Sequence, residues 1–319
     1  MKVLITGGAG FIGSHLAEKL IERGDEVYII DNLSTGRLEN IKHLAKNENF
    51  HYTIDSIMNE KAMDNLASKC EHIYHLAAAV GVKLIMDKPI ETIETNVRGT
   101  EIVLKVANRY KCKVLIASTS EIYGNHVLHS LHEDDNRVMG SVKKRRWAYA
   151  ASKATDEFLA LAYYDEKKLP VVITRFFNTV GPRQTGTYGM VIPNFIQDAL
   201  LDKPITVYGD GDQSRSFTYV GDVVDAVIKL MSHPDAVGNI FNIGSEEEIT
   251  INELASKVKE MAASKSAITH IPYEEVYGKG FEDMRKRVPN INRIKELIGY
   301  KSTADIDMII KSVIEYFKS

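Results

Sequence analysis

The chain has 319 residues, enough for one large domain or two smaller ones whose cores need no disulfide bonds. Hydrophobic residues make up 44% and charged residues 26% of it, a balance that excludes disordered, collagen-like and coiled-coil proteins. The net charge of -3 excludes a strong attraction to nucleic acid or to an anionic membrane. No apolar stretch approaches the ~20 residues that cross a bilayer, and the N-terminus lacks the apolar core of a signal peptide. We therefore expect a cytoplasmic protein with no membrane partner.

The first half of the chain alternates short β-branched runs with long amphipathic segments, the pattern of a doubly wound parallel sheet. After the first run, Ile12, Leu16 and Leu20 lie on one face of a predicted helix that Gly24 can end. The sequence therefore predicts an α/β fold of the Rossmann type. Its predicted strands are Lys2–Thr6, Glu26–Ile30, Phe50–Ile54, His72–Leu76, Lys113–Ala117 and Val171–Arg175.

The second half of the sequence has a looser pattern. From about Asn178 onward it contains loops rich in glycine and proline, short strands and separate helices such as Asn252–Met261. No Pro/Ser-rich linker lets two modules separate. We predict a Rossmann domain over residues 1–177 and a smaller C-terminal α/β substrate lobe over residues 178–319, with some elements interleaved.

The two cysteines and one basic run are expected to have no part in catalysis or binding. Cys70 and Cys112 are isolated, with no histidine cluster nearby, so we expect two buried thiols and no metal site. The basic run Lys143–Arg146 precedes a predicted helix in a nearly neutral chain, so we expect a solvated loop without a function.

A glycine-rich turn follows the first predicted strand. Gly7, Gly10 and Gly13 let the backbone approach a pyrophosphate and let the helix pack closely on the strand, and the helix N-terminus offers free N–H groups. Asp31 ends the second strand, where a carboxylate accepts hydrogen bonds from the adenosine ribose and repels a 2′-phosphate. This favours NAD over NADP, although the guanidinium of Arg37 could in principle pair with a 2′-phosphate.

Tyr149 and Lys153 stand at positions i and i+4 of a predicted helix, so their side chains emerge from one face. A free tyrosine has a pKa near ~10, and a neighbouring ammonium lowers that pKa by stabilising the phenolate. The turn Ser118–Gly124 closes the fifth predicted strand, at the edge where ligands of open α/β sheets bind. The sequence therefore predicts a catalytic site at this edge.

Together these motifs make the chain resemble the extended short-chain dehydrogenase/reductase family, and within it the NAD-dependent nucleotide-sugar epimerases, dehydratases and decarboxylases. The resemblance covers essentially the whole chain. It is carried by Thr6–Gly13, Asp31–Leu33, Leu76–Ala78, Asn96, Ser118–Glu121, Tyr149 with Lys153, Arg175–Asn178, Gly181–Arg183 and Gly209–Arg215.

The resemblance implies a role for each matching residue. Tyr149 is the proton acceptor on the sugar hydroxyl, Lys153 holds the nicotinamide ribose, and Thr119 hydrogen-bonds the reacting oxygen, next to Ser120 and Glu121. The implied residues for NAD are Gly7, Gly10, Phe11, Ile12, Gly13, Asp31, Asn32, Asp55, Ser56, Leu76, Ala77, Ala78, Asn96, Tyr149 and Lys153. The implied residues for a UDP-sugar are Thr119, Asn178, Arg183, Val191, Tyr208, Arg215, Arg285 and Arg287, with Arg215 neutralising the diphosphate.

The fate of a 4-keto sugar defines each enzyme of that family. Ser120 stands where the dehydratases have Asp, which disfavours dehydration. The turn Thr119–Glu121 and Arg287 resemble UDP-glucuronate decarboxylases, but residues 76–99 lack their Ser-Pro-rich loop and look more like 4-epimerases. We predict a 4-epimerase acting on UDP-glucose/galactose or on the N-acetylhexosamine pair, with a UDP-glucuronate decarboxylase as the alternative.

Three further expectations follow from the resemblance. Helices near Glu91–Asn108 and Tyr149–Tyr164 pair into a four-helix dimer interface in similar enzymes, so we expect a homodimer. The second diphosphate-binding arginine of epimerases aligns with Gly280–Asp283, where Lys279 or Arg285 could substitute. A non-catalytic NAD-sensing regulator is a remote alternative, because such proteins usually lack the catalytic tyrosine and lysine that this chain has.

Overall fold

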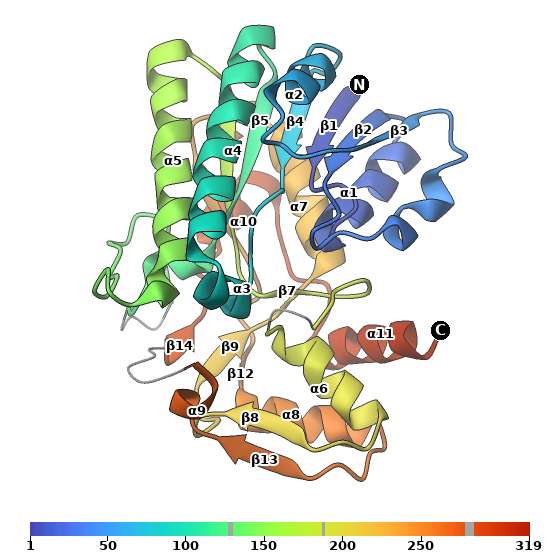
Figure 1. The fold of residues 1–319 in the computed structure, drawn as a ribbon, viewed down its shortest axis with the longest axis vertical. Coiled ribbons are helices and arrows are strands. Elements are labelled where there is room, and N and C mark those ends of the chain that lie inside the picture. The colour runs from blue at the N-terminus through green and yellow to red at the C-terminus, as the bar shows by residue number, and fades with distance from the viewer. Residues whose placement is uncertain (127–129, 187–188, 278–283) are drawn as a thin grey trace.

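The computed structural model describes residues 1–126, 130–186, 189–277 and 284–319. At its centre is a seven-stranded sheet in the order β11-β6-β5-β4-β1-β2-β3, in which every neighbouring pair is parallel (Figure 1). The strand order reverses between β1 and β4, which confirms the predicted doubly wound Rossmann-type fold. The strands are β1 (Lys2–Thr6), β2 (Glu26–Asp31), β3 (Phe50–Ile54), β4 (His72–His75), β5 (Lys113–Thr119), β6 (Val171–Phe176) and β11 (Ile240–Ile243).

Helices cover both faces of this sheet. On one face α1 and α7 bury Leu16 and Val227, together with residues of α10; on the other face α2, α4 and α5 bury Val103 and Ala160. Figure 1 shows α4 and α5 running side by side along the sheet. Both faces of the strands are therefore apolar, as a parallel sheet requires. These helices are α1 (Phe11–Glu22), α2 (Glu60–Ala67), α4 (Pro89–Tyr110), α5 (Ala148–Lys167), α7 (Val220–Ser232) and α10 (Asn292–Ile298).

The six strands predicted from the sequence all form, with ends within two residues of the prediction. Strand β5 continues to Thr119 instead of ending at Ala117, and β4 ends at His75. Gly24 follows α1 with a φ of 90°, as predicted for the residue that ends this helix. The sequence did not predict the seventh strand, β11, whose pairing partner β6 is far away in the chain.

A smaller lobe lies below the carboxyl ends of these strands in Figure 1. Its core is formed by α6, α8 and α11, which bury Phe195, Leu254 and Ile310 together with β8. Three small sheets pair β13 with β8, β12 and β14 with β9, and β10 with β7. The elements are α6 (Val191–Leu200), α8 (Ile251–Met261), α9 (Tyr273–Tyr277), α11 (Ile306–Lys318), β7 (Thr179–Val180), β8 (Ile205–Tyr208), β9 (Ser214–Ser216), β10 (Thr218–Tyr219), β12 (Glu248–Thr250), β13 (Ile268–Ile271) and β14 (Lys286–Arg287).

Three of the sequence-based expectations concern single features. Cys70 and Cys112 are free and buried, as predicted, and burial raises their pKa values to about 12 and about 11. Within the described ranges, no helix is long and apolar enough to span a membrane. No group of metal-ligating side chains was found among the same residues.

Candidate active site

The glycine turn joins β1 to α1 and is closed by backbone contacts. A Cβ on Gly13 would overlap the carbonyl oxygen of Gly7, and a Cβ on Gly7 would lie 2.9 Å from the backbone nitrogen of Ala77. Gly7 also has a φ of 73°, which favours glycine. Gly10 is the N-cap of α1 and has no capping side chain, so the first N–H groups of the helix are free to bind an anion. The turn therefore has the shape and the donors that a pyrophosphate requires.

Asp31 ends β2 beside this turn. Its carboxylate accepts hydrogen bonds from the backbone N–H groups of Ala9 at 3.0 Å and Leu33 at 2.8 Å. Burial raises the pKa of Asp31, and these N–H groups oppose that rise. Asn32 follows Asp31 directly, and the backbone N–H of Asp55 donates to the Asp31 carbonyl at 3.1 Å. The carboxyl ends of β2 and β3 thus bring together the side chains expected at an adenosine ribose.

The segment after β4, which begins with Leu76, Ala77 and Ala78, is held by Asn96 of α4. Asn96 Oδ1 accepts from the N–H of Ala79 at 2.8 Å, and its Nδ2 donates to Ser152 Oγ at 3.1 Å. Asn96 is 1% exposed, so it acts from inside the protein. Its observed role is to fix this segment against α4 and α5. Ser56, another predicted cofactor residue, lies just after β3 and donates its backbone N–H to Asp55 Oδ1 at 2.7 Å.

Tyr149 and Lys153 are buried residues of α5, the helix that packs against β5. Tyr149 lines the cavity of the site, whereas Lys153 is buried behind it, with Nζ 2.6 Å from Asp156 Oδ2. Burial raises the pKa of Tyr149, the charge of Glu121 adds to that rise, and a hydrogen bond with Thr119 opposes it. Tyr149 therefore stands at the cavity wall, with the hydroxyl of Thr119 beside its phenol.

Glu121 makes ion pairs with two arginines, Arg146 and Arg287. The second of these arginines also donates to Asn178 Oδ1. Burial alone would raise the pKa of Glu121, but the two guanidinium groups hold it well below its usual value. One carboxylate facing two guanidinium groups leaves an excess of one positive charge at the cavity wall.

The burial of Arg146 corrects one sequence-based expectation. Lys143–Arg146 was expected to be a solvated loop without a function, but the side chain of Arg146 is 4% exposed and is paired with Glu121. The ion pair compensates for the loss of hydration that burial imposes on the guanidinium. A signal was present in the sequence: Arg146 stands three residues before Tyr149, a spacing that brings two side chains to one side of a helical segment.

These residues surround a cavity of about 660 Å³ between the sheet edge and the smaller lobe. Two predicted substrate residues do not line it: Arg183 pairs with Glu18 of α1 at 2.6 Å, and exposed Arg285 pairs with Asp210 at 2.7 Å. Lys279 and Gly280–Asp283 lie outside the described residues. The predicted residues that do line the cavity are Phe11, Ile12, Thr119, Ser120, Glu121, Tyr149, Asn178, Val191, Tyr208, Arg215 and Arg287.

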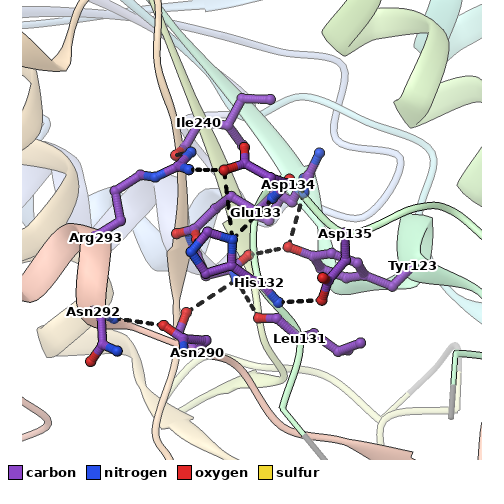
Figure 2. Close-up of polar contacts among 12 residues, drawn as sticks. Tyr123, Leu131, His132, Glu133, Asp134, Asp135, Ile240, Asn290, Asn292 and Arg293 are labelled. Carbon is purple, nitrogen blue, oxygen red and sulfur yellow. Dashed lines mark hydrogen bonds and ion pairs between the residues drawn. The ribbon is translucent and has the colours of Figure 1, made fainter. Parts of the chain in front are cut away.

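The segment that follows Arg287 is tied to the large domain by a buried polar network. Leu131 donates its N–H to the carbonyl of Val288 at 2.9 Å and accepts from the N–H of Asn290 at 2.8 Å. Figure 2 shows Leu131 close to Asn290. Asn242 of β11 reaches the same place, since its Nδ2 donates to the Leu131 carbonyl at 2.8 Å. The network holds β14, and with it Arg287, opposite Glu121. Nothing in the sequence signals it, because its members come from three distant segments.

The sequence matches the GDP-mannose 4,6-dehydratase family over residues 4–313. The chain belongs to this family of extended short-chain dehydrogenases/reductases. A UDP-N-acetyl-α-D-glucosaminuronate decarboxylase of Bacillus cytotoxicus is 43% identical over 99% of this chain and 98% of that protein. UDP-glucuronic acid decarboxylase 1 of Danio rerio is 36% identical over 99% of this chain and 72% of that protein.

Solved structures show the same fold. The UDP-glucuronic acid 4-epimerase of Bacillus cereus, in complex with UDP-glucuronic acid and NAD, is 28% identical and superposes with a TM-score of 0.90 over 100% of this chain and 99% of that one. The family and this complex confirm the prediction that the cofactor is NAD. The protein is thus an NAD-dependent enzyme of the nucleotide-sugar branch of its family.

Proposed function

We propose that the protein is a decarboxylase of a UDP-linked hexuronic acid, of the class of UDP-glucuronate and its 2-N-acetyl form. The observation that carries this proposal is the excess positive charge of Arg146 and Arg287 around Glu121, beside Tyr149. A hexose with an uncharged C6 hydroxymethyl group has no use for a second guanidinium, whereas the C6 carboxylate of a hexuronic acid does. The 43% identity to the Bacillus cytotoxicus decarboxylase favours the same activity over the predicted 4-epimerase of neutral sugars.

The residues at the cavity wall suit the chemistry of this reaction. Tyr149 takes the proton of the sugar 4-hydroxyl, and Thr119 donates a hydrogen bond to the same oxygen. The glycine turn and Asp31 would hold NAD, which would supply the acceptor for the C4 hydride. The C4 ketone then lies β to the C6 carboxylate, so the C5–C6 bond breaks with release of CO₂ and its electron pair moves into the enolate at C5 and C4. Hydrogen bonds from Tyr149 and Thr119 to that oxygen stabilise the enolate. Protonation at C5 then gives a 4-ketopentose, and return of the hydride to C4, with the proton held by Tyr149 passing back to the C4 oxygen, gives the UDP-pentose.

The arginines orient the leaving carboxylate in this proposal. Arg287 also contacts Asn178, so the guanidinium is fixed between the catalytic turn and the start of the smaller lobe. Glu121 keeps both guanidinium groups at the cavity wall by pairing with them. Positioning of this kind lowers the barrier because the reacting groups are already aligned.

A second candidate is C4 epimerisation of the same acid. The Bacillus cereus relative with the TM-score of 0.90 is a UDP-glucuronic acid 4-epimerase. Its substrate carries the same C6 carboxylate, so two arginines would serve epimerisation as well, provided that the carboxylate is retained. Decarboxylation releases CO₂ and leaves a UDP-pentose, whereas epimerisation leaves a UDP-hexuronic acid inverted at C4.

The test is incubation of the purified protein and NAD with UDP-glucuronate, its 2-N-acetyl form, UDP-glucose and UDP-N-acetylglucosamine, with products identified by NMR and CO₂ measured. We expect CO₂ and a UDP-pentose from at least one of the two acids. Inversion at C4 of an acid without CO₂ would establish the second candidate. Interconversion of the neutral sugars alone would overturn the proposal and restore the predicted 4-epimerase.

We also propose a homodimer that pairs α4 and α5 of two copies. These helices pack against each other and present Ile90, Ile93 and Phe158 to solvent, at 73%, 44% and 61% exposure. Apolar side chains of this size on neighbouring helices favour association. Light scattering should give twice the chain mass for the wild type, and Phe158→Glu should shift the protein towards the monomer.

A further inference from the structure

The ammonium of Lys153 is paired inside the protein. Its Nζ lies 2.6 Å from Oδ2 of Asp156, almost one turn further along α5, and the two side chains are 2% and 0% exposed. Burial raises the pKa of Asp156, and the charge of Lys153 opposes that rise. A buried ion pair adds little net stability compared with apolar residues of the same size, so stability alone does not account for this carboxylate.

His75, a titratable neighbour on which the charge of Lys153 acts, does not balance that charge. His75 of β4 is fully buried, with its ring nitrogens 2.8 Å from Thr6 Oγ1 and 3.0 Å from Thr100 Oγ1. Burial and the nearby ammonium lower the pKa of His75 to about 3, so its ring is neutral. Asp156 is therefore the carboxylate that faces the ammonium at the centre of this interior cluster.

We propose that Asp156 is a positioning residue for the proton transfer: its carboxylate holds the Lys153 ammonium and offsets part of the positive charge that Lys153 presents to the Tyr149 phenol. The inference rests on the proposed function, in which Tyr149 is the base. Four groups act on that phenol. Glu121 and Asp156 raise the pKa of Tyr149, whereas the Thr119 hydroxyl and the Arg287 guanidinium lower it.

The arrangement has a consequence for the pH dependence. A phenolate is the active form of the base, so the rate rises with pH until Tyr149 ionises. Removing the negative charge of Asp156 leaves the ammonium of Lys153 unbalanced and favours the phenolate. The acidic limb of the profile should then move to lower pH, which is a gain of activity at low pH. A residue with a merely structural role would not produce such a gain.

The test is the pH profile of kcat/KM for the NAD-loaded wild type and for Asp156→Asn, which keeps the size of the side chain and removes its charge. We expect the acidic limb of the variant about one pH unit lower, so that well below the limb it outpaces the wild type by up to about tenfold. Asp156→Glu, which restores the charge, should return the limb to its wild-type position. An acidic limb that stays in place in Asp156→Asn, with activity reduced equally at every pH, would overturn the proposal.

Two further variants keep the outcome interpretable. Asp156→Ser removes the same charge with a smaller side chain, so a folding defect of the asparagine variant would not prevent the measurement; the thermal midpoint of each variant is recorded. Tyr149→Phe separates this inference from the proposed function. If Tyr149→Phe keeps the wild-type activity and limb, the role of Tyr149 fails; if it abolishes activity while the Asp156 variants leave the limb unmoved, only the role of Asp156 fails.

Discussion

The glycine turn after β1 and the cluster of Glu121 with its two arginines lie at the same edge of the sheet, but they are built in different ways. The turn keeps its shape through backbone contacts of neighbouring residues, such as the close approach of Gly13 to Gly7. The cluster depends on charged side chains from separate segments, with Arg146 before α5 and Arg287 on β14. A turn of the first kind recognises a feature common to many ligands, the pyrophosphate, whereas a cluster of the second kind can change with one side chain. In the proposed function, specificity for the sugar therefore belongs to the cluster.

The largest expected effect concerns Tyr149, which lines the cavity together with Glu121 and its two arginines. Tyr149→Phe keeps the ring that lines the cavity and removes the phenol, so turnover should fall by ~10²–10⁴-fold with the fold intact. The check is product formation by NMR together with the thermal midpoint. Near wild-type turnover would show that another group takes the proton.

Gly13→Ala tests the glycine turn, whose shape depends on backbone contacts, and Gly24→Ala is its matched control. The Cβ at position 13 would overlap the Gly7 carbonyl, whereas the Cβ at position 24 meets nothing within 4 Å and adds only the strain of a φ of 90°. We expect Gly13→Ala to lower the free energy of unfolding by about 3 kcal/mol, and Gly24→Ala by about 1 kcal/mol. Urea unfolding measures both. Equal losses would show that the turn tolerates a side chain.

Arg146→Met, with Arg145→Met as its control, sharpens the comparison at the cluster. Arg146 is buried against Glu121, while its neighbour Arg145 is exposed. Loss of the buried cation should reduce kcat/KM for the hexuronic acid by about 10–100-fold, because Glu121 then loses one of its two arginine partners and the cavity wall loses a positive charge. The control should stay within about twofold of the wild type. A comparable loss in both variants would point to the overall charge of the run instead of to the buried contact.

The smallest effect at neutral pH concerns His75, whose ring contacts Thr6 at the end of β1, just before the glycine turn. Its pKa is about 3 in the folded protein and about 6.5 when unfolded, so between these values only the unfolded chain binds the extra proton. Stability from this residue is therefore full above about pH 6.5 and is lost as the pH falls towards 3, by up to ~1.4 kcal/mol per pH unit. His75→Gln should flatten the dependence of the unfolding free energy on pH. Parallel curves for variant and wild type would contradict this assignment.

The parts of the molecule that the sequence predicts well depend on residues close together in the chain. The alternation of strands and helices, the turn from Gly7 to Gly13 and the spacing of Tyr149 and Lys153 are all local patterns, and the first two are confirmed by the fold. The position of Arg287 was inferred only through a family resemblance, and the structure brings it to the cavity wall.

The parts that the sequence misses depend on long-range contacts. A basic run such as Lys143–Arg146 has the composition of a solvated loop, and only the distant carboxylate of Glu121 makes one of its members buried. The sequence also does not predict the partners of Arg183 and Arg285. These guanidinium groups pair with Glu18 and Asp210, which lie far away in the chain, instead of facing the cavity. Charge complementarity across the fold decides such positions, and composition does not encode it.

The edge position of β11 also bears on how the chain is made. Residues 240–243 complete the sheet by pairing with β6, which is translated much earlier. While the nascent chain leaves the ribosome, the open edge of β6 exposes unpaired N–H and C=O groups that can recruit another strand. The Rossmann sheet is therefore finished only after much of the smaller lobe has been synthesised, and a fragment that ends at residue 177 should aggregate where the full chain folds.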